Sequence, residues 1–193
     1  MTAAEGREIA GTRLTLPMAP QTRGGLRAGD HLLLSGGMLT ARDQAHRRLA
    51  AALEAGGPLP VDLRDQVVYY AGPSPAAQGK PAGPVGPTTS ARMDPYTPRL
   101  AAAGVAAFIG KGPRSREVRN VLRERGCLYL VAVGGAAALL GSRVRSMRTV
   151  AYADLGPEAI WELEVEDFPV VVAYDLAGGD IFSHLETAPG TGL

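Results

Sequence analysis

The chain has 193 residues, of which 46% are hydrophobic and 20% charged, a composition typical of a folded protein with one domain and a sizeable core. Its 20 Lys and Arg residues balance 19 Asp and Glu residues, so there is no broad basic field of the kind that tracks nucleic acid. No segment reaches the roughly 18 consecutive apolar residues that a membrane span needs. We therefore expect neither nucleic acid nor a membrane as a partner.

The first third of the chain predicts two strands and a helix. "RLTLP" alternates as a short strand should, and "GDHLLLSGGMLTARDQAHRRLAAALEAGG" then predicts an apolar strand, a glycine turn and a helix. Thr40, followed three residues later by Asp43, resembles the capping box that opens a helix. Gly56-Gly57 is expected to end it.

A strand over residues 67–71 leads into a Pro/Gly/Ala segment that runs from residue 72 to 87 without periodicity. A loop of this length inside a compact domain is usually functional or mobile. We therefore expect the segment to matter more than its composition suggests.

The second half of the chain alternates helices and strands. The expected elements are a helix opened by Asp94-Pro95, a strand at 105–109, a helix at 115–125 capped by Ser115, a strand at 128–133, a short helix in "GGAAALLGSRV", a strand at 149–152, and two or three strands joined at 167–169 and 177–179. This mixed order predicts an α/β domain with both parallel and hairpin strand pairings.

Two features of the second half bear on its surroundings. Five arginines interleaved with two glutamates predict a solvated helix: Arg114, Arg116, Arg119, Arg123, Arg125, Glu117 and Glu124. The single cysteine, Cys127, lies in the apolar run "GCLYLVAVGG" and is expected to be a core thiol. Together with an opening segment that lacks a basic and an apolar leader region, it favours a reducing, cytoplasmic location.

Three junctions between loops and helices carry polar residues: "LTARDQAH" at 39–46, "GPTTSARMD" at 86–94 and "GKG" at 110–112. In α/β folds such junctions expose side chains beside helix N-termini. Arg42, Arg92 and Lys111 would give one site three cations. Because arginine binds a carboxylate at two points and free N–H groups add donors, the set suits a ligand with two carboxylates.

Each of these residues also has a structural interpretation. Arg42 also fits a partner of Asp43 or a residue on the helix surface, and Thr88 and Thr89 fit an N-cap and a turn residue. Lys111 fits a solvated loop lysine equally well.

His46 and Glu158 are ambiguous in the same way. His46 follows Arg42 by one helical turn, so it could orient that arginine or a ligand, or be an ordinary satisfied histidine. Glu158 in "GPEAIW" is most simply an acid in the first turn of a helix.

Nucleotide and metal motifs are absent from the sequence. "GPVGPTTS" lacks the lysine of GxxxxGK[ST], and neither "GKGPRS" nor "VGGAAALLG" matches GxGxxG. One cysteine and histidines at 31, 46 and 184 give no ligand spacing for a metal.

Six motifs, in order and at their separations, resemble the β region of the class I, iron-sulfur-dependent fumarate hydratases, which is also the β subunit of L-tartrate dehydratase. They are "LTARDQAHRRL", "VYYAGP", "GPVGPTTSARMD", "FIGKGPRS", "YLVAVGGAAALL" and "LGPEAIWELEVEDFPVVVAYD". The resemblance spans residues 13–182 and implies a swivelling β/β/α domain with a mixed sheet. Residues 1–12 and 183–193 are then expected to be an N-terminal tail and a flexible C-terminal tail.

The resemblance implies a two-part enzyme of the tricarboxylic acid cycle that adds water reversibly to fumarate to give L-malate. An α region holds a 4Fe-4S cluster on three cysteines, and its open iron acts as a Lewis acid on the substrate. This chain, with one cysteine, resembles the β part made as a separate subunit. It would bind no cluster itself and be active only with an α subunit, in a heterodimer or a dimer of heterodimers.

The resemblance also assigns residues, motif by motif. The substrate-binding residues are Arg42 of "RDxAH", Thr89 and Arg92 of "GPTTSAR", and Lys111 of "GKG". Thr88, the first threonine of "GPTT", takes the proton-transfer role, although a threonine hydroxyl is a poor base unless neighbours lower its pKa. His46 and Asp43 are candidate supporting residues.

The substrate has alternatives. "GKGPRSREV" and "GPEAIWELEVEDFP" resemble the fumarase branch more than the tartrate branch, and mesaconate hydration is a third possibility. A dicarboxylate-binding domain that does no chemistry is the alternative from outside the enzymes.

Overall fold

The structure is a computed structural model that describes residues 10–74, 76, 78–132 and 136–183. Its strands are β1 (Thr12–Thr15), β2 (His31–Thr40), β3 (Val67–Tyr69), β4 (Ala107–Gly110), β5 (Leu128–Val131), β6 (Val144–Ala151) and β7 (Ile160–Tyr174). Its helices are α1 (Pro20–Gly25), α2 (Asp43–Glu54), α3 (Thr97–Ala102), α4 (Arg116–Glu124) and α5 (Ala137–Ser142), with 3₁₀ helices η1 (Ser90–Met93) and η2 (Ala153–Glu158).

All seven strands belong to one mixed sheet with the order β1-β2-β3-β4-β5-β7-β6. Neighbours from β1 to β5 pair in parallel, whereas β7 runs antiparallel to β2, β5 and β6. The additional pairing of β2 with β7 closes β2, β3, β4, β5 and β7 into a barrel, with β1 and β6 outside it. The predicted α/β domain with mixed pairings is confirmed.

The central strands are apolar on both faces because both faces are buried. Tyr69 of β3 and Ile109 of β4 belong to the core inside the closed sheet. The residues next to them in sequence, Tyr70 and Phe108, belong to a second core under the helices. Strands buried on both sides read as continuous apolar runs, which is why the sequence predicts them correctly.

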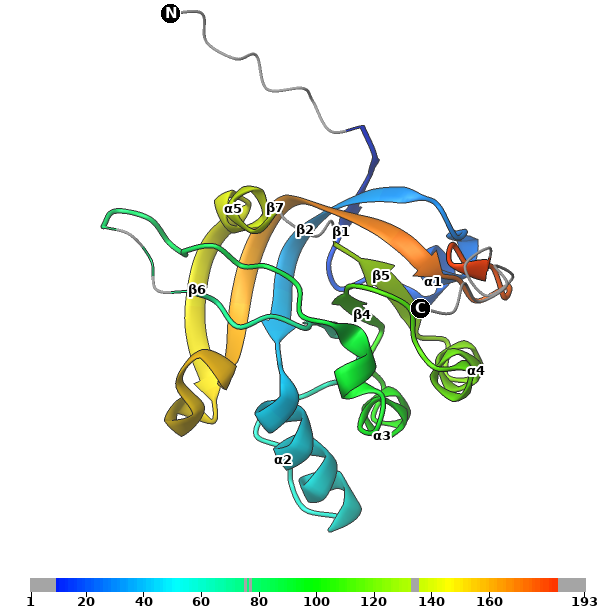
Figure 1. Ribbon diagram of the computed structural model, residues 1–193, viewed down its shortest axis with the longest axis horizontal. Helices are drawn as coiled ribbons and strands as arrows, with labels where there is room; N and C mark the ends of the chain where they lie inside the picture. The colour runs from blue at the N-terminus through cyan, green and yellow to red at the C-terminus, as the bar shows by residue number, and fades with distance from the viewer. Residues whose placement is uncertain (1–9, 75, 77, 133–135, 184–193) are drawn as a thin grey trace, which may run out of the picture.

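Helices α2, α3 and α4 lie next to one another on one side of the sheet, whereas α5 lies beside β6 (Figure 1). Each of the three contributes a fully buried leucine to the second core: Leu49 from α2, Leu100 from α3 and Leu122 from α4. Burying a leucine side chain stabilises a fold by roughly 1.5–3 kcal/mol, so this layer holds the three helices against the sheet.

Two predicted turns are wrong, because the strands run through them. β2 continues past Gly36, where φ is +116° and the pairing register with β7 shifts after Leu34. A Cβ at Gly36 would lie 3.0 Å from the Leu16 carbonyl oxygen. β7 continues past Asp167, whose φ is +49° and whose backbone N–H donates to Ser35 Oγ at 3.0 Å. The two irregularities lie opposite each other, so β2 and β7 keep their pairing on both sides of them.

Two of the predicted helix caps are also wrong. Thr40 Oγ1 does not cap α2 but accepts a hydrogen bond from the Trp161 backbone N–H at 3.3 Å. Asp94 does not open α3, which begins at Thr97; the Asp94 carboxylate binds Arg114 instead. The predicted cap of α4 is confirmed, since Ser115 Oγ accepts from the N–H of the third residue along.

The predicted solvated arginine helix is partly wrong. Arg116 and Arg123 lie on α4 and are exposed, but Arg114 precedes the helix and is only 4% exposed. Arg119 forms an ion pair with Asp180.

Cys127 is the expected core thiol, 1% exposed, and burial raises its pKa. None of the described helices is long and apolar enough to cross a membrane. Gly134-Gly135, predicted to open a helix, and the tail segments 1–9 and 184–193 lie outside the described residues.

Candidate functional site

The three predicted junctions meet at one edge of the sheet. β2, β3 and β4 run parallel, so the segments that follow their carboxyl ends emerge together. The Thr88 N–H donates to the Tyr70 carbonyl oxygen just after β3, at 2.7 Å. Thr89 forms an isolated parallel bridge with Lys111, just after β4. The strip at 86–94 therefore lies beside the strip at 110–112.

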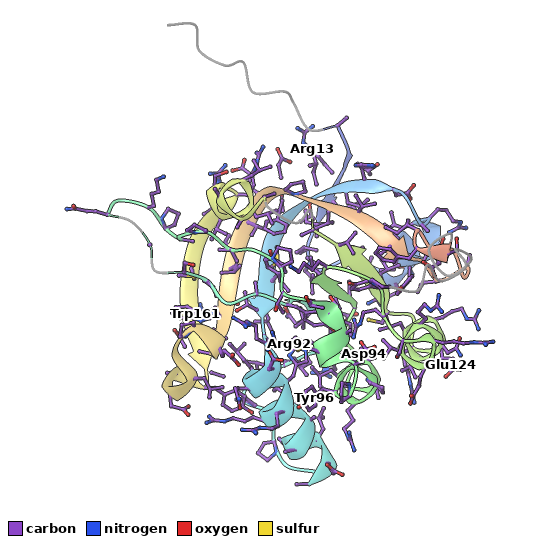
Figure 2. All side chains as sticks on the ribbon, in the orientation of Figure 1. Arg13, Arg92, Asp94, Tyr96, Glu124 and Trp161 are labelled. Carbon is purple, nitrogen blue, oxygen red and sulfur yellow. The ribbon has the colours of Figure 1, made fainter. Side chains whose placement is uncertain are left out.

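Arg92 joins this pair of strips to the third. Its Nε lies 2.9 Å from Asp43 Oδ1 and its Nη2 lies 2.9 Å from Asp43 Oδ2, a two-point ion pair. Asp43 is the first residue of α2, and Arg92, which belongs to η1, lies near the start of that helix (Figure 2). The Arg92 side chain is 53% exposed, so its guanidinium still faces solvent while Asp43 orients it.

Arg42 immediately precedes α2 and lies against a different acid. Its Nη2 is 3.9 Å from Glu158 Oε1, and Glu158 Oε2 accepts from the Gln44 backbone N–H at 3.0 Å. Glu158 therefore binds the start of α2. The prediction that it is an acid in the first turn of its own helix is wrong. A Cβ at Gly72 would lie 3.1 Å from Arg42 Nη1 and 2.8 Å from the Pro157 carbonyl oxygen, so only glycine leaves room for this guanidinium.

His46 lies beneath Arg42 and is fully buried. Its Nδ1 is 3.0 Å from the Arg42 carbonyl oxygen, which can only accept, so Nδ1 carries the hydrogen. Burial lowers the pKa of His46 to about 4, and the imidazole is neutral at physiological pH. It packs edge-on against the Tyr70 ring at 5.1 Å. The histidine thus supports the main chain at Arg42, and its Nε2 has no hydrogen-bond partner among the described residues.

Buried polar atoms without a hydrogen-bond partner collect at the start of α2. Among the described residues they include Arg42 Nε, His46 Nε2 and Asp43 Oδ2, the last of which contacts Arg92 only as an ion pair. Trp161 Nε1 is another, on the strand residue that pairs with Thr40. A buried polar group without a partner costs free energy, on the order of 1–3 kcal/mol. Arg42 Nε and His46 Nε2 therefore leave hydrogen-bonding capacity unused at this helix start.

Thr88, Thr89 and Lys111 complete the site. Thr88 is half-buried, and Thr89 and Lys111 are exposed. Thr89 makes no side-chain cap bond to η1, so the capping interpretation is wrong for it. Within the described part of the chain, neither threonine hydroxyl forms a hydrogen bond and the Lys111 ammonium forms no ion pair. All three polar groups are available to a ligand.

The donor set of the described residues does not suit a metal. No group of three His, Cys, Asp or Glu side chains comes together in them. The one thiol, on Cys127, is buried and lies 3.7 Å from the Leu128 carbonyl oxygen.

Arg114, which lies behind the site, is predicted from the sequence only as part of a solvated helix. Its side chain is fully buried and joins Asp94, Thr97 and Tyr70 from three segments. Nothing in "GKGPRS" distinguishes a buried arginine from the exposed arginines that follow, because its partners are distant in sequence.

A barrel-like α/β domain with basic side chains gathered at the ends of its parallel strands is of a class suited to small anionic ligands. The comparison with known proteins is more specific. A family model described as the fumarase C-terminus matches residues 5–185. The chain belongs to this family, as the resemblance of the six motifs implied.

Relatives of two kinds are similar to this chain. The anaerobic class I fumarate hydratase of Escherichia coli K12 is 40% identical over 156 residues, which cover 80% of this chain but 28% of that protein. The mitochondrial fumarate hydratase 1 of Leishmania major has the same identity and coverage. A putative L(+)-tartrate dehydratase subunit beta of Methanocaldococcus jannaschii is 38% identical over 166 residues, which cover 83% of this chain and 85% of that protein. The chain thus spans under a third of these fumarate hydratases and most of the β subunit.

Proposed function

We propose that this chain is the β subunit of an iron-sulfur hydro-lyase whose reaction is the reversible hydration of fumarate to L-malate. In this proposal the chain supplies the dicarboxylate-binding and proton-transfer residues, and a separate α subunit supplies the rest of the site. The observation that carries it is the convergence of Arg42, Arg92 and Lys111 at one edge of the sheet, beside two threonine hydroxyls.

The charges fit a dicarboxylate. Lys111 is a compact cation with no acidic partner among the described residues, and Arg92 is a planar cation already oriented by Asp43. Arg42 adds a buried Nε that finds no hydrogen-bond partner in the described part of the chain. Two carboxylates carry two negative charges, so three cations offset by Asp43 and Glu158 leave a net attraction for the ligand when both ends are engaged.

Thr88 is the proposed proton-transfer residue. Its hydroxyl is half-buried and bonded to no other group within the described residues, so it is free to contact substrate. A threonine hydroxyl needs a nearby positive charge to act as a base. Lys111 is the candidate, because it forms a strand-like bridge with Thr89, the residue after Thr88.

The cluster belongs, in this proposal, to the α subunit. The single thiol of this chain is buried away from solvent and does not fit a cluster site. When bound, the cluster would supply Lewis-acid chemistry. The longer relatives, in which the matched region is 28% of the protein, are consistent with the two parts being joined in one chain elsewhere.

The second candidate is the β subunit of L-tartrate dehydratase. It is favoured by the Methanocaldococcus jannaschii relative, because the match covers 85% of that protein. Mesaconate hydration requires the same clamp for two carboxylates and is a third outcome.

Oxygen-free co-expression with a cluster-bearing α subunit tests these candidates through kcat/KM for L-malate, tartrate and mesaconate. The largest value for L-malate supports the proposal, and the largest for tartrate or mesaconate replaces the substrate. A pair that turns over none of the three substrates would contradict the proposal that this chain is part of a hydro-lyase. Calorimetry then decides whether the isolated chain binds dicarboxylates, as a non-catalytic binding domain would.

A further inference from the structure

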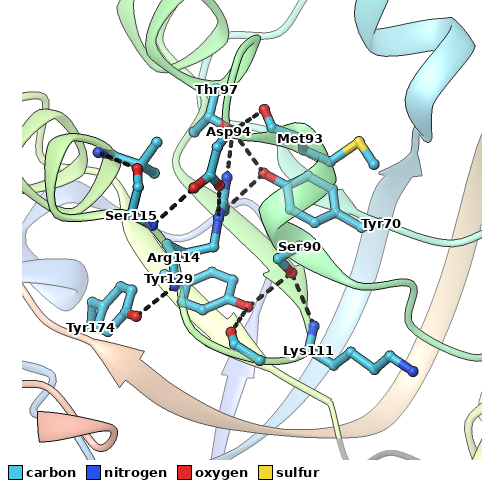
Figure 3. A network of polar contacts seen from close by, with 12 residues as sticks. Tyr70, Ser90, Met93, Asp94, Thr97, Lys111, Arg114, Ser115, Tyr129 and Tyr174 are labelled. Atoms are coloured by element: carbon cyan, nitrogen blue, oxygen red, sulfur yellow. Dashed lines mark hydrogen bonds and ion pairs between the residues drawn. The ribbon is translucent and has the colours of Figure 1, made fainter. Parts of the chain in front are cut away.

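A fully buried cation lies directly behind the candidate site. The Arg114 Nε lies 2.6 Å from Asp94 Oδ1, Nη2 donates to Thr97 Oγ1 at 2.6 Å and Nη1 donates to Tyr70 Oη at 3.2 Å (Figure 3). The exposed fraction of the Arg114 side chain is 0%. A charge removed from water is tolerated only when it is paired and hydrogen-bonded, so these partners are held in place.

The Arg114 guanidinium also lies between two aromatic rings. Its central carbon is 5.3 Å from the centre of the Tyr70 ring and 5.1 Å from that of Tyr129. Cation–π contacts of this kind gain strength when water is excluded. The guanidinium therefore fixes the Tyr129 ring, and with it the hydroxyl group that the ring carries.

The Tyr129 hydroxyl binds both strips of the site. It lies 2.7 Å from the Gly112 carbonyl oxygen and 2.8 Å from Ser90 Oγ. Because the carbonyl can only accept, Tyr129 donates there and the Ser90 hydroxyl supplies the hydrogen of the other contact.

Ser90 in turn holds Lys111. Ser90 Oγ accepts from the Lys111 backbone N–H at 3.0 Å, and the Ser90 N–H donates to the Lys111 carbonyl oxygen at 3.1 Å. Gly110 permits this approach, since a Cβ there would collide with Ser90 Oγ and lie 2.8 Å from a carbon of the Tyr70 ring. Lys111 is thus held directly by Ser90, and the next residue along by Tyr129.

Asp94 connects the other cation to the same network. It follows η1, which carries Arg92, and its Oδ2 accepts from the Ser115 backbone N–H at 2.8 Å while Oδ1 binds Arg114. The end of η1 is therefore fastened to the start of α4.

We propose that Arg114 is a positioning residue that sets Arg92 and Lys111 at the separation required by a ligand with two carboxylates, an inference that rests on the proposed function. Arg114 is buried and touches no group that faces the ligand side, so it acts through Asp94, Tyr129 and Ser90. These six residues form the Arg114 network: Tyr70, Ser90, Asp94, Thr97, Arg114 and Tyr129.

The first test uses the isolated full chain and amide hydrogen exchange. Arg114→Lys keeps a positive charge but cannot reach all three partners, and Tyr129→Phe keeps the ring but loses the hydroxyl. Both variants should exchange the Ser90 and Lys111 amides about tenfold faster than the wild-type chain, while the β2 amides that pair with β7 are unchanged. The matched control is Leu122→Ala, which removes a buried side chain of α4 outside the network.

The second test uses the reconstituted pair. Arg114→Lys and Tyr129→Phe should raise KM for the dicarboxylate at least tenfold, whereas Leu122→Ala, a purely structural change, should leave KM unchanged. If the Ser90 and Lys111 amides exchange no faster in Arg114→Lys and Tyr129→Phe than in Leu122→Ala, Arg114 is not a positioning residue, even if the wild-type pair is active. A wild-type pair that is inactive on every substrate, with exchange still responding, overturns the proposed function and leaves the coupling of the two strips established. If Arg114→Lys does not fold, Tyr129→Phe alone tests the proposal.

Discussion

Arg92 and Asp43 hold each other at two points across the boundary between η1 and α2, with both N···O distances at 2.9 Å. The pair joins residues 49 positions apart in sequence. It turns an exposed arginine into an oriented one before any ligand arrives, and it leaves the outer edge of the guanidinium free to bind. Asp43 thus orients Arg92, and in the proposed function it acts on the ligand only through that arginine.

Removing Arg92 tests whether this orientation serves substrate. Arg92→Ala should lower kcat/KM of the reconstituted pair, because a charge-assisted contact to a carboxylate is lost. The loss should correspond to on the order of 2–4 kcal/mol of transition-state stabilisation. Arg99→Ala is the matched control, since Arg99 pairs with Glu54 at 3.3 Å and is 47% exposed against 53% for Arg92. Equal values of kcat/KM for the two variants would return Arg92 to a structural role.

Thr88 can be tested by its hydroxyl alone. Thr88→Val keeps the shape of the side chain and removes the hydroxyl, so kcat should fall roughly 100-fold or more if Thr88 transfers a proton. Thr88→Ser restores the hydroxyl and should recover most of kcat. If the valine variant keeps its kcat and changes only KM, Thr88 binds substrate and another group moves the proton.

His46 predicts an acid-sensitive fold. The ordinary pKa of 6.5 applies to the unfolded chain, and burial, the largest cause, lowers the pKa of the folded state to about 4, with smaller opposing effects from Arg42 and Asp43. Between pH 6.5 and about 4 the His46 imidazole is therefore protonated in the unfolded chain but neutral in the folded chain. The free energy of unfolding should fall by roughly 3 kcal/mol as the pH drops from 6.5 to about 4.

Urea denaturation of the full chain between pH 7 and pH 4 measures this slope. His46→Gln should flatten it, whereas His31→Gln, at an exposed position at the start of β2, should leave it unchanged. A slope that survives in His46→Gln would assign the acid sensitivity to other groups.

Gly110 should not tolerate a side chain. Gly110→Ala brings a Cβ against Ser90 Oγ and Tyr70, and overpacking of this kind costs roughly 1–3 kcal/mol of unfolding free energy. Gly24→Ala is the control, because nothing lies within 4 Å of a Cβ at that position in α1. Equal stabilities of the two variants in thermal or urea unfolding would contradict the tight approach of Ser90.

The sequence predicts those elements whose signals are local. β3, β4 and β5 are short apolar runs buried on both faces, and α4 has a serine cap, so period and capping suffice. β2 and β7 are misjudged because Gly36 and Asp167 resemble turns locally, while a long antiparallel ladder between the two strands overrides them. Local patterns do not report pairing partners more than a hundred residues away.

The same distinction applies to the site. The convergence of the three strips follows from parallel strand order, which the alternation of strands and helices already suggests. The Arg92–Asp43 pair, the contact of Glu158 with the start of α2 and the buried Arg114 depend on packing between distant segments. The sequence therefore indicates which residues could bind a dicarboxylate, and the fold shows which residues hold them.

The central claim is that this chain supplies the dicarboxylate-binding half of a hydro-lyase site. The most direct measurement is an oxygen-free titration in which a fixed amount of cluster-bearing α subunit receives increasing amounts of this chain while L-malate dehydration is followed. Neither protein should turn over alone, and activity should rise until the α subunit is saturated, with a much lower plateau for Arg92→Ala. Full activity of the α subunit without this chain, or an inert mixture on L-malate, tartrate and mesaconate alike, would contradict the claim.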